Sequence, residues 1–193
     1  MDLKEKIIDA VIEEFNDKGL KFTMDDIAKR LGISKRTLYT VVRDKEALFL
    51  EAVDTVFSAI KQSEREIVAD DTLDLLEKLK RILIVMPERY RTIDFRQLYD
   101  LKSKFPRIYA KIENRLETDW DATVQIMDQA MEEGVIRPIS LPVFQAMFTG
   151  TIEYYLSRSL LLDSAITYEA AVREMLDILI HGVMRQENRK ESL

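Results

Sequence analysis

Apolar residues recur at helical spacing along most of the chain. In residues 3–18 they predict one face of a helix that ends at Gly19, a face made of Ile7, Ile8, Val11, Ile12 and Phe15. The same spacing predicts a second helix that begins after Thr23, a third that begins after Ser34, and a fourth that begins near Asp44. The first fifty residues therefore predict three helices and the start of a fourth.

Capping residues support the second and third of these helices. Thr23 supplies an N-cap oxygen, and Asp26 stands three residues later at the capping-box position. A glycine before the third helix can adopt the positive φ that ends the second. The third helix is expected to turn Leu38, with Val41 or Val42, toward the interior. Its outward face then carries cations and hydroxyls, namely Lys35, Arg36, Thr37, Tyr39 and Thr40.

The rest of the chain predicts longer helices. Apolar stripes indicate helices over residues 72–86, 141–161 and 168–188, a helical segment over 88–105, and one long helix over 106–133. The whole chain holds only five glycines and four prolines, which disfavours hairpins. The fold class is therefore predicted to be all-α, with about nine helices in total.

Composition excludes several kinds of chemistry. The chain has no cysteine and only one histidine, His181, so disulfides, thiol catalysis, zinc sites and a Ser-His-Asp triad are not expected. No enzyme activity, catalytic residue, metal or cofactor is predicted. The N-terminus lacks a secretory pattern, and the longest apolar run, 82–86, is far below the roughly 18 residues of a membrane span. A cytoplasmic location without a membrane partner is expected.

The net charge of −6 is unevenly distributed. Residues 30–45 hold five basic residues and one acidic residue, a local charge of +4, whereas residues 46–193 are strongly acidic. An acidic protein with one basic segment can bind a polyanion only through that segment. The basic residues concerned are Arg30, Lys35, Arg36, Arg43 and Lys45.

Three stretches together resemble the TetR family of transcriptional regulators: I-I-D-A-V-I-E-E-F-N-D-K-G (7–19), T-M-D-D-I-A-K-R-L-G-I-S-K-R-T-L-Y (23–39) and D-K-E-A-L-F (44–49). The resemblance implies an N-terminal three-helix helix-turn-helix DNA-binding domain over residues 1–48, with a connecting helix from about residue 44. It also implies a helical ligand-binding and dimerisation domain over residues 49–193. The implied partners are a second copy of the chain and double-stranded DNA with a palindromic operator.

The resemblance also implies the operator contacts. It places them on Thr23, Ser34, Lys35, Arg36, Thr37, Tyr39 and Lys45. Lys35 and Arg36 can reach guanine O6 and N7, while Thr37 and Thr40 can meet a thymine methyl group or a phosphate. Lys45, with the free amides of its helical turn, is expected to bind a phosphate. Val41 and Val42 replace the aromatic residues usual in the family, and Arg43 is a candidate to bind the phosphate in place of the first of these aromatics.

Aromatic residues in the C-terminal region suggest a pocket for a small lipophilic or aromatic ligand, since such pockets combine apolar walls with a few polar groups. The candidates are Tyr90, Phe95, Tyr99, Tyr109, Trp120, Phe148 and Tyr154. Each could instead be an aromatic residue of the core or of an interface. The last two helices are apolar over more than one face, which favours a dimer interface there. Its candidate residues are Phe148, Ile152, Tyr155, Met175, Leu179 and Val183.

These features predict a sequence-specific DNA-binding transcriptional regulator, a repressor that a small-molecule ligand releases from its operator. Two alternatives stay open. The protein could be a DNA-binding regulator without a small-molecule effector. It could also be a helical enzyme or carrier in which the basic helix is incidental.

Overall fold

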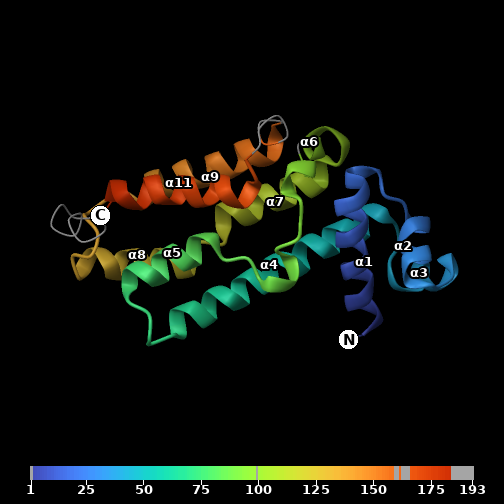
Figure 1. The fold of residues 1–193 in the computed structure, drawn as a ribbon, viewed down its shortest axis with the longest axis horizontal. Coiled ribbons are helices and arrows are strands. Elements are labelled where there is room, and N and C mark those ends of the chain that lie inside the picture. Colours follow the sequence, from blue (N-terminus) through green and yellow to red (C-terminus); the bar gives the residue numbers. More distant parts are fainter. Residues whose placement is uncertain (1, 99, 159–160, 162–165, 184–193) are drawn as a thin grey trace.

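The computed structural model describes residues 2–98, 100–158, 161 and 166–183. Over these ranges the chain is helical and contains no β-strand, which confirms the predicted all-α class. Figure 1 shows the three N-terminal helices, residues 3–41, clustered at one end of the long axis and the other helices extending away from them. We call α1–α3 the head and the elements from α5 onward the body.

The head contains α1 (Leu3–Lys18), the 3-10 turn η1 (Gly19–Lys21), α2 (Met24–Leu31) and α3 (Lys35–Val41). Each α-helix begins with a side-chain cap, because Asp2, Thr23 and Ser34 accept an N–H from the first turn of their helices. Ile27 and Leu38 are fully buried between the three helices. Local capping and a shared apolar centre therefore hold the head together.

One continuous helix, α4 (Lys45–Ala69), leaves the head and runs along the body. Asp44 caps it by accepting the N–H of Ala47 at 2.8 Å. The predicted boundary after residue 48 falls inside this helix. Buried apolar residues of the head, α4 and the body also belong to one contiguous cluster. Head and body are therefore joined by a helix and by a shared core.

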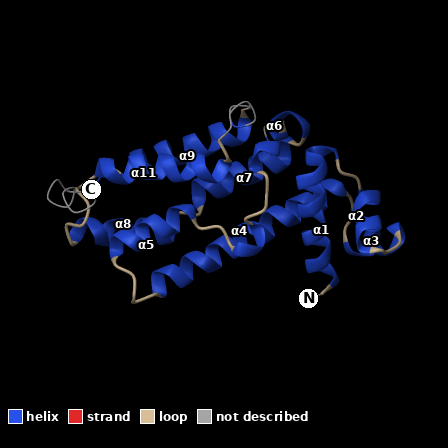
Figure 2. Cartoon of the chain, in the orientation of Figure 1, coloured by secondary structure: helices blue, strands red, loops and turns tan. Residues whose placement is uncertain are grey.

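The body contains α5 (Leu75–Ile84), η2 (Glu88–Tyr90), η3 (Phe95–Leu98), α6 (Leu101–Lys104), α7 (Pro106–Thr118), α8 (Asp121–Glu132), α9 (Leu141–Ser157) and α11 (Tyr168–Val183). Figure 2 shows that most of these helices are long and that irregular chain connects α5 to α7. Helix α5 packs on α8 and on α11, and α4 packs on α7. No helix in the described part of the chain is long and apolar enough to span a membrane.

The single long helix predicted over residues 106–133 is wrong, because the chain breaks between α7 and α8. At the break, the indole Nε1–H of Trp120 donates to the Leu116 carbonyl at 2.7 Å, the acceptor that the next backbone N–H of a continuing helix would use. Lys61 of α4 donates to the Asp119 carbonyl. Side chains thus bind the backbone carbonyls at this point. Both halves pack on α4, but α7 also packs on α6 and α9, whereas α8 packs mainly on α5.

The predicted helical segment over residues 88–105 is replaced by two 3-10 turns and the four-residue helix α6. Pro87 precedes the segment. Two backbone groups of the segment form hydrogen bonds with a side chain of α1 instead of with the segment itself. The side chain of Asn16 on α1 donates to the Thr92 carbonyl and accepts the Asp94 N–H. A continuous α-helix would need these groups for its own ladder, so the contact with α1 competes with helix formation.

Candidate nucleic-acid interface

A glycine builds the turn between α2 and α3. Gly32 ends α2 with a φ of 64°, and its N–H is directed at the carbonyls of Ala28 and Lys29. The N–H of Ile33 then donates to the Ala28 carbonyl at 3.0 Å. Because this backbone conformation favours glycine, the turn directs α3 away from α2 in one fixed orientation.

Helix α3 presents a polar face to solvent. Ser34 accepts the N–H of Thr37 at 3.0 Å and so caps the helix. Leu38 is fully buried and Val42 is 6% exposed, whereas Val41 is 38% exposed, so Val42 completes the inward face. The candidate contact residues of this helix are all exposed, namely Ser34, Lys35, Arg36, Thr37, Tyr39 and Thr40.

The hydroxyl of Thr23 is engaged within the head. It donates to Asp26 Oδ2 at 2.7 Å and accepts the Asp26 N–H at 3.2 Å, while the Thr23 N–H donates to the same carboxylate at 2.8 Å. Lys18 Nζ lies 2.7 Å from Asp26 Oδ1, and this bond, with those from Thr23, holds the pKa of Asp26 far below its usual range. The Thr23 hydroxyl therefore already has a partner within the head, although the residue is exposed. Its contact with the operator stays a prediction.

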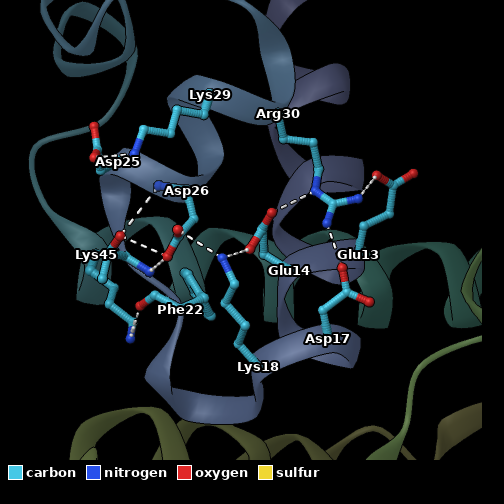
Figure 3. A network of polar contacts seen from close by, with 11 residues as sticks. Glu13, Glu14, Asp17, Lys18, Phe22, Asp25, Asp26, Lys29, Arg30 and Lys45 are labelled. Atoms are coloured by element: carbon cyan, nitrogen blue, oxygen red, sulfur yellow. Dashed lines mark hydrogen bonds and ion pairs between the residues drawn. The ribbon is translucent and has the colours of Figure 1, made fainter.

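Arg30, which contributes to the local charge of +4, is exposed but binds carboxylates of α1. Its guanidinium lies 2.9 Å from a carboxylate oxygen of Glu13, 2.7 Å from one of Glu14 and 2.5 Å from one of Asp17 (Figure 3). Glu14 is only 4% exposed and also contacts Lys18. Arg30 therefore neutralises acidic residues of α1 and holds α2 against it.

Lys45 is also engaged within the head. Its ammonium points inward and donates to the carbonyls of Leu20 at 2.7 Å and Phe22 at 2.5 Å (Figure 3). It lies 4.2 Å from the ring centre of Phe22 and 5.3 Å from that of Phe105. Burial lowers the pKa of Lys45. A phosphate contact of Lys45 would require these bonds to break, and it stays a prediction.

The remaining cations of the segment stay at the surface. Lys35 Nζ lies 3.1 Å from Asp25, and Arg43, whose side chain is 79% exposed, lies 2.7 Å from Asp44. Arg36 has no ion pair within the described residues. Exposed ion pairs contribute little stability, so phosphate can replace these carboxylates. Of the basic residues in segment 30–45, Lys35, Arg36 and Arg43 therefore remain available for contact with DNA.

A cavity of about 1090 Å³, partly open to solvent, lies between α4, α5, α9, α11 and the break between α7 and α8. Of the predicted ligand residues, Phe95, Trp120 and Phe148 line it. Three others do not line it: Tyr90 and Tyr109 are buried elsewhere, and Tyr154 is 51% exposed. The predicted residue Tyr99 lies outside the described residues.

Charged residues of the cavity wall escaped prediction. Glu64 of α4 is 7% exposed, and one of its oxygens lies 2.5 Å from Lys61 Nζ. Burial raises the pKa of Glu64. Arg115 also lines the cavity and lies 2.9 Å from Asp119. In the sequence, Glu64 lies four residues after Ile60 and so falls on the apolar stripe of α4. A carboxylate on an apolar face was the signal that could have predicted a polar group in the cavity wall.

The predicted dimer residues of α9 and α11 mostly face the chain's own core. Four of them are less than 9% exposed, namely Phe148, Ile152, Met175 and Val183. The other two, Tyr155 and Leu179, are partly exposed and pack against the core. The exposed apolar residues of these two helices are instead Val143, Met147, Tyr154 and Ile178, at 57%, 53%, 51% and 66%. The four buried residues are therefore not accessible to a second subunit in this structure, whereas Tyr155 and Leu179 keep some exposed surface.

A three-helix head whose capped third helix exposes cations and hydroxyls defines a helix-turn-helix DNA-binding protein. Residues 7–52 match the family model for bacterial regulatory proteins, tetR family. The head of the chain is thus similar to the DNA-binding region of this family, and the comparisons support a DNA-binding transcriptional regulator.

Similar proteins extend the comparison beyond the head. The helix-turn-helix transcriptional regulator YvaF of Bacillus subtilis is 26% identical over 185 residues, which cover 96% of this chain and 97% of the relative. A TetR transcription regulator from Haloarcula marismortui shares the fold with a TM-score of 0.73 at 17% identity, over 94% of this chain and 98% of that one. The regulator FadR from Bacillus subtilis, solved with stearoyl-CoA, gives a TM-score of 0.60 at 18% identity, over 93% and 98%.

Proposed function

We propose that this regulator is a homodimeric repressor that binds a palindromic operator and leaves it when a small lipophilic ligand occupies the body cavity. The observation that carries the ligand part is the cavity of about 1090 Å³, whose wall combines Trp120 and Phe148 with the charged groups of Glu64 and Arg115. This mixture of apolar wall and few polar groups is typical of small-molecule sites. FadR, with a similar fold, was solved with stearoyl-CoA.

The exposed face of α3 supports the operator contacts. Arg36 and Lys35 stand at the start of the helix with their side chains in solvent, where they can reach base edges in a major groove. The hydroxyls of Ser34 and Thr37 lie 2.9 Å apart, and Thr40 donates to the Thr37 carbonyl, so these groups are already ordered. Arg43 is placed for a phosphate contact beyond the end of α3.

Exposed apolar side chains of α9 and α11 support the dimer. Both helices run along one edge of the molecule in Figure 1. Gly150 and Gly182 are exposed on them with open space where a Cβ would stand, which permits close approach of another helix. A large exposed apolar surface favours a protein interface. Twofold symmetry would then present two α3 helices to half-sites about 34–36 Å apart, or a multiple of that.

The test begins with DNA fragments selected from a random double-stranded pool by the purified full-length chain. A palindromic consensus, binding that weakens steeply with salt, and release by stearoyl-CoA or a free fatty acid would support the proposal. Binding that is independent of salt, or a consensus without twofold symmetry, would contradict the DNA part. Failure of every lipophile to bind would favour a regulator without a small-molecule effector.

A further inference from the structure

The irregular chain between α5 and α7 lies between the cavity and the head, and its residues 88–98 contact α1. Arg89 binds Asp9 through two bonds, at 2.8 and 2.9 Å. Asn16 binds the same segment farther along the chain. Asp9 and Asn16 are seven residues apart, so they lie on one face of α1, about 10.5 Å apart along its axis. The segment is therefore bound to α1 at two points, two helical turns apart.

At the second of these points, both the nitrogen and the oxygen of the Asn16 side-chain amide form hydrogen bonds. Its Nδ2 donates to the Thr92 carbonyl at 2.8 Å, and its Oδ1 accepts the Asp94 N–H at 2.9 Å. The side chain of Gln97 donates to the Asn16 carbonyl at 3.2 Å. These bonds join α1 to the backbone of the segment, so they constrain the path of the chain and not only a flexible side chain.

Close packing reinforces this junction. Gly19, directly after α1, approaches Gln97 so closely that a Cβ at Gly19 would collide with the Gln97 side-chain oxygen. Elements η1 and η3 are therefore in direct contact, and η3 also packs on α9 of the body. η3 therefore contacts both the head and the body.

The opposite side of the same segment forms part of the cavity wall. Ile93, Phe95 and Arg96 line the cavity, and Phe95 stacks on Tyr168 of α11 with ring centres 4.7 Å apart. Asp94 holds Arg96 through bonds of 2.7 and 3.0 Å, which fixes the guanidinium in the wall. Residues 92–97 thus have one side on α1 and the other on the space that a ligand would fill.

We infer that residues 92–97 transmit occupancy of the cavity to the head, and that Asn16 is the positioning residue that couples this segment to α1. The inference rests on the proposed ligand response and specifies its route. A ligand that displaces Phe95 or Arg96 also moves the backbone directly before them, and the two amide bonds of Asn16, to Thr92 and Asp94, carry this movement to α1. Since Arg30 binds α2 to α1, the orientation of α3 follows.

The test uses the full-length protein, its selected operator and 8-anilinonaphthalene-1-sulfonate as an apolar probe. The chain has a single tryptophan, Trp120, which lines the cavity, so quenching of its emission reports occupancy. The variant is Asn16→Ala. The matched control is Asn114→Ala, since Asn114 is an exposed asparagine of α7 that does not line the cavity.

In the wild type and the Asn114→Ala control, saturating probe is expected to change operator affinity by about fivefold or more, the usual lower range of allosteric coupling. In Asn16→Ala the change is expected to fall below about twofold while probe affinity stays the same. If Asn16→Ala fails to fold, Asn16→Asp serves instead, because it removes the donation to Thr92 and keeps an acceptor for the Asp94 N–H.

The outcomes separate the two proposals. Undiminished coupling in a folded Asn16 variant overturns the relay and leaves the ligand response intact. A probe that quenches Trp120 without altering operator affinity in the wild type overturns both. Abolished coupling with unchanged probe affinity supports the relay, because a purely structural defect would weaken operator binding with and without the probe alike.

Discussion

The ammonium of Lys45 lies 4.2 Å from the ring centre of Phe22, inside the head and away from its exposed cationic surface. Two backbone carbonyls complete its surroundings. We therefore expect Lys45→Met to destabilise the protein by about 1–3 kcal/mol, because the carbonyls are left without their donor. The slope of log affinity against log salt for the operator should stay at the wild-type value.

Arg43→Met is the matched comparison for Lys45→Met. The Arg43 side chain is 79% exposed and is the proposed phosphate contact, so its removal should reduce the magnitude of the salt slope by about 1, the effect of one phosphate contact. Anisotropy titrations from low to moderate salt measure both slopes. A reduced slope in Lys45→Met would show that its ammonium reaches phosphate in the complex.

Arg30→Met tests the link between α1 and α2. Glu14 is 4% exposed, and removal of Arg30 leaves this carboxylate with Lys18 alone. A decrease of about 3 kcal/mol in the free energy of unfolding is expected, at the lower end for a broken buried pair. Lys29→Met is the control, because Lys29 forms only an exposed pair with Asp25 and should cost less than about 1 kcal/mol. Urea unfolding measures the free energy of unfolding of both variants. An equal decrease in the two would contradict the proposal that Arg30 holds α2 against α1.

Glu64 makes stability depend on pH. Burial raises its pKa in the folded state above the ordinary 4.5, so the folded protein holds this proton to higher pH than the unfolded chain does. Stability therefore decreases as pH rises from about 4.5 through the folded-state pKa. Glu64→Gln cannot release that proton, so its stability relative to wild type should increase between about pH 4.5 and 7.5. Urea midpoints across this range measure the difference, and a constant difference would contradict the raised pKa.

The exposed apolar residues of α9 and α11 predict the oligomeric state. Ile178→Asp places a carboxylate at a side chain that is 66% exposed, so the fold should persist while the proposed dimer dissociates. Gln125→Asp introduces the same carboxylate at an exposed position of α8 and should leave the dimer intact. Sedimentation velocity distinguishes them. A dimeric Ile178→Asp, or a wild type that is monomeric, would contradict this interface.

The head was largely predictable because its signals are local. The Thr23–Asp26 capping box, the positive φ of Gly32 and the Ser34 cap each depend on residues within a few positions. The role of Lys45 was not predictable, because its partners Leu20 and Phe22 lie more than twenty residues away and are brought to it only by folding.

The errors in the body also have physical causes. The apolar stripe continues across the break at Trp120, so periodicity alone cannot show that an indole replaces a backbone donor there. In α9, apolar residues occur on several faces, so residue type cannot distinguish buried Phe148 from exposed Met147. Which of these faces is internal depends on neighbouring helices, and this information is absent from the local pattern.

The unbroken length of α4 has a mechanical consequence. The helix holds 25 residues and is therefore about 37 Å long. Glu64, near one end, lines the cavity, while Lys45, at the other, is bound within the head. A tilt of about 5° over this length displaces the far end by about 3 Å, close to the roughly 3.4 Å spacing of successive base pairs. Under the proposed ligand response, a helix of this length would convert a small angular change at the cavity into a misalignment of one base step at the operator.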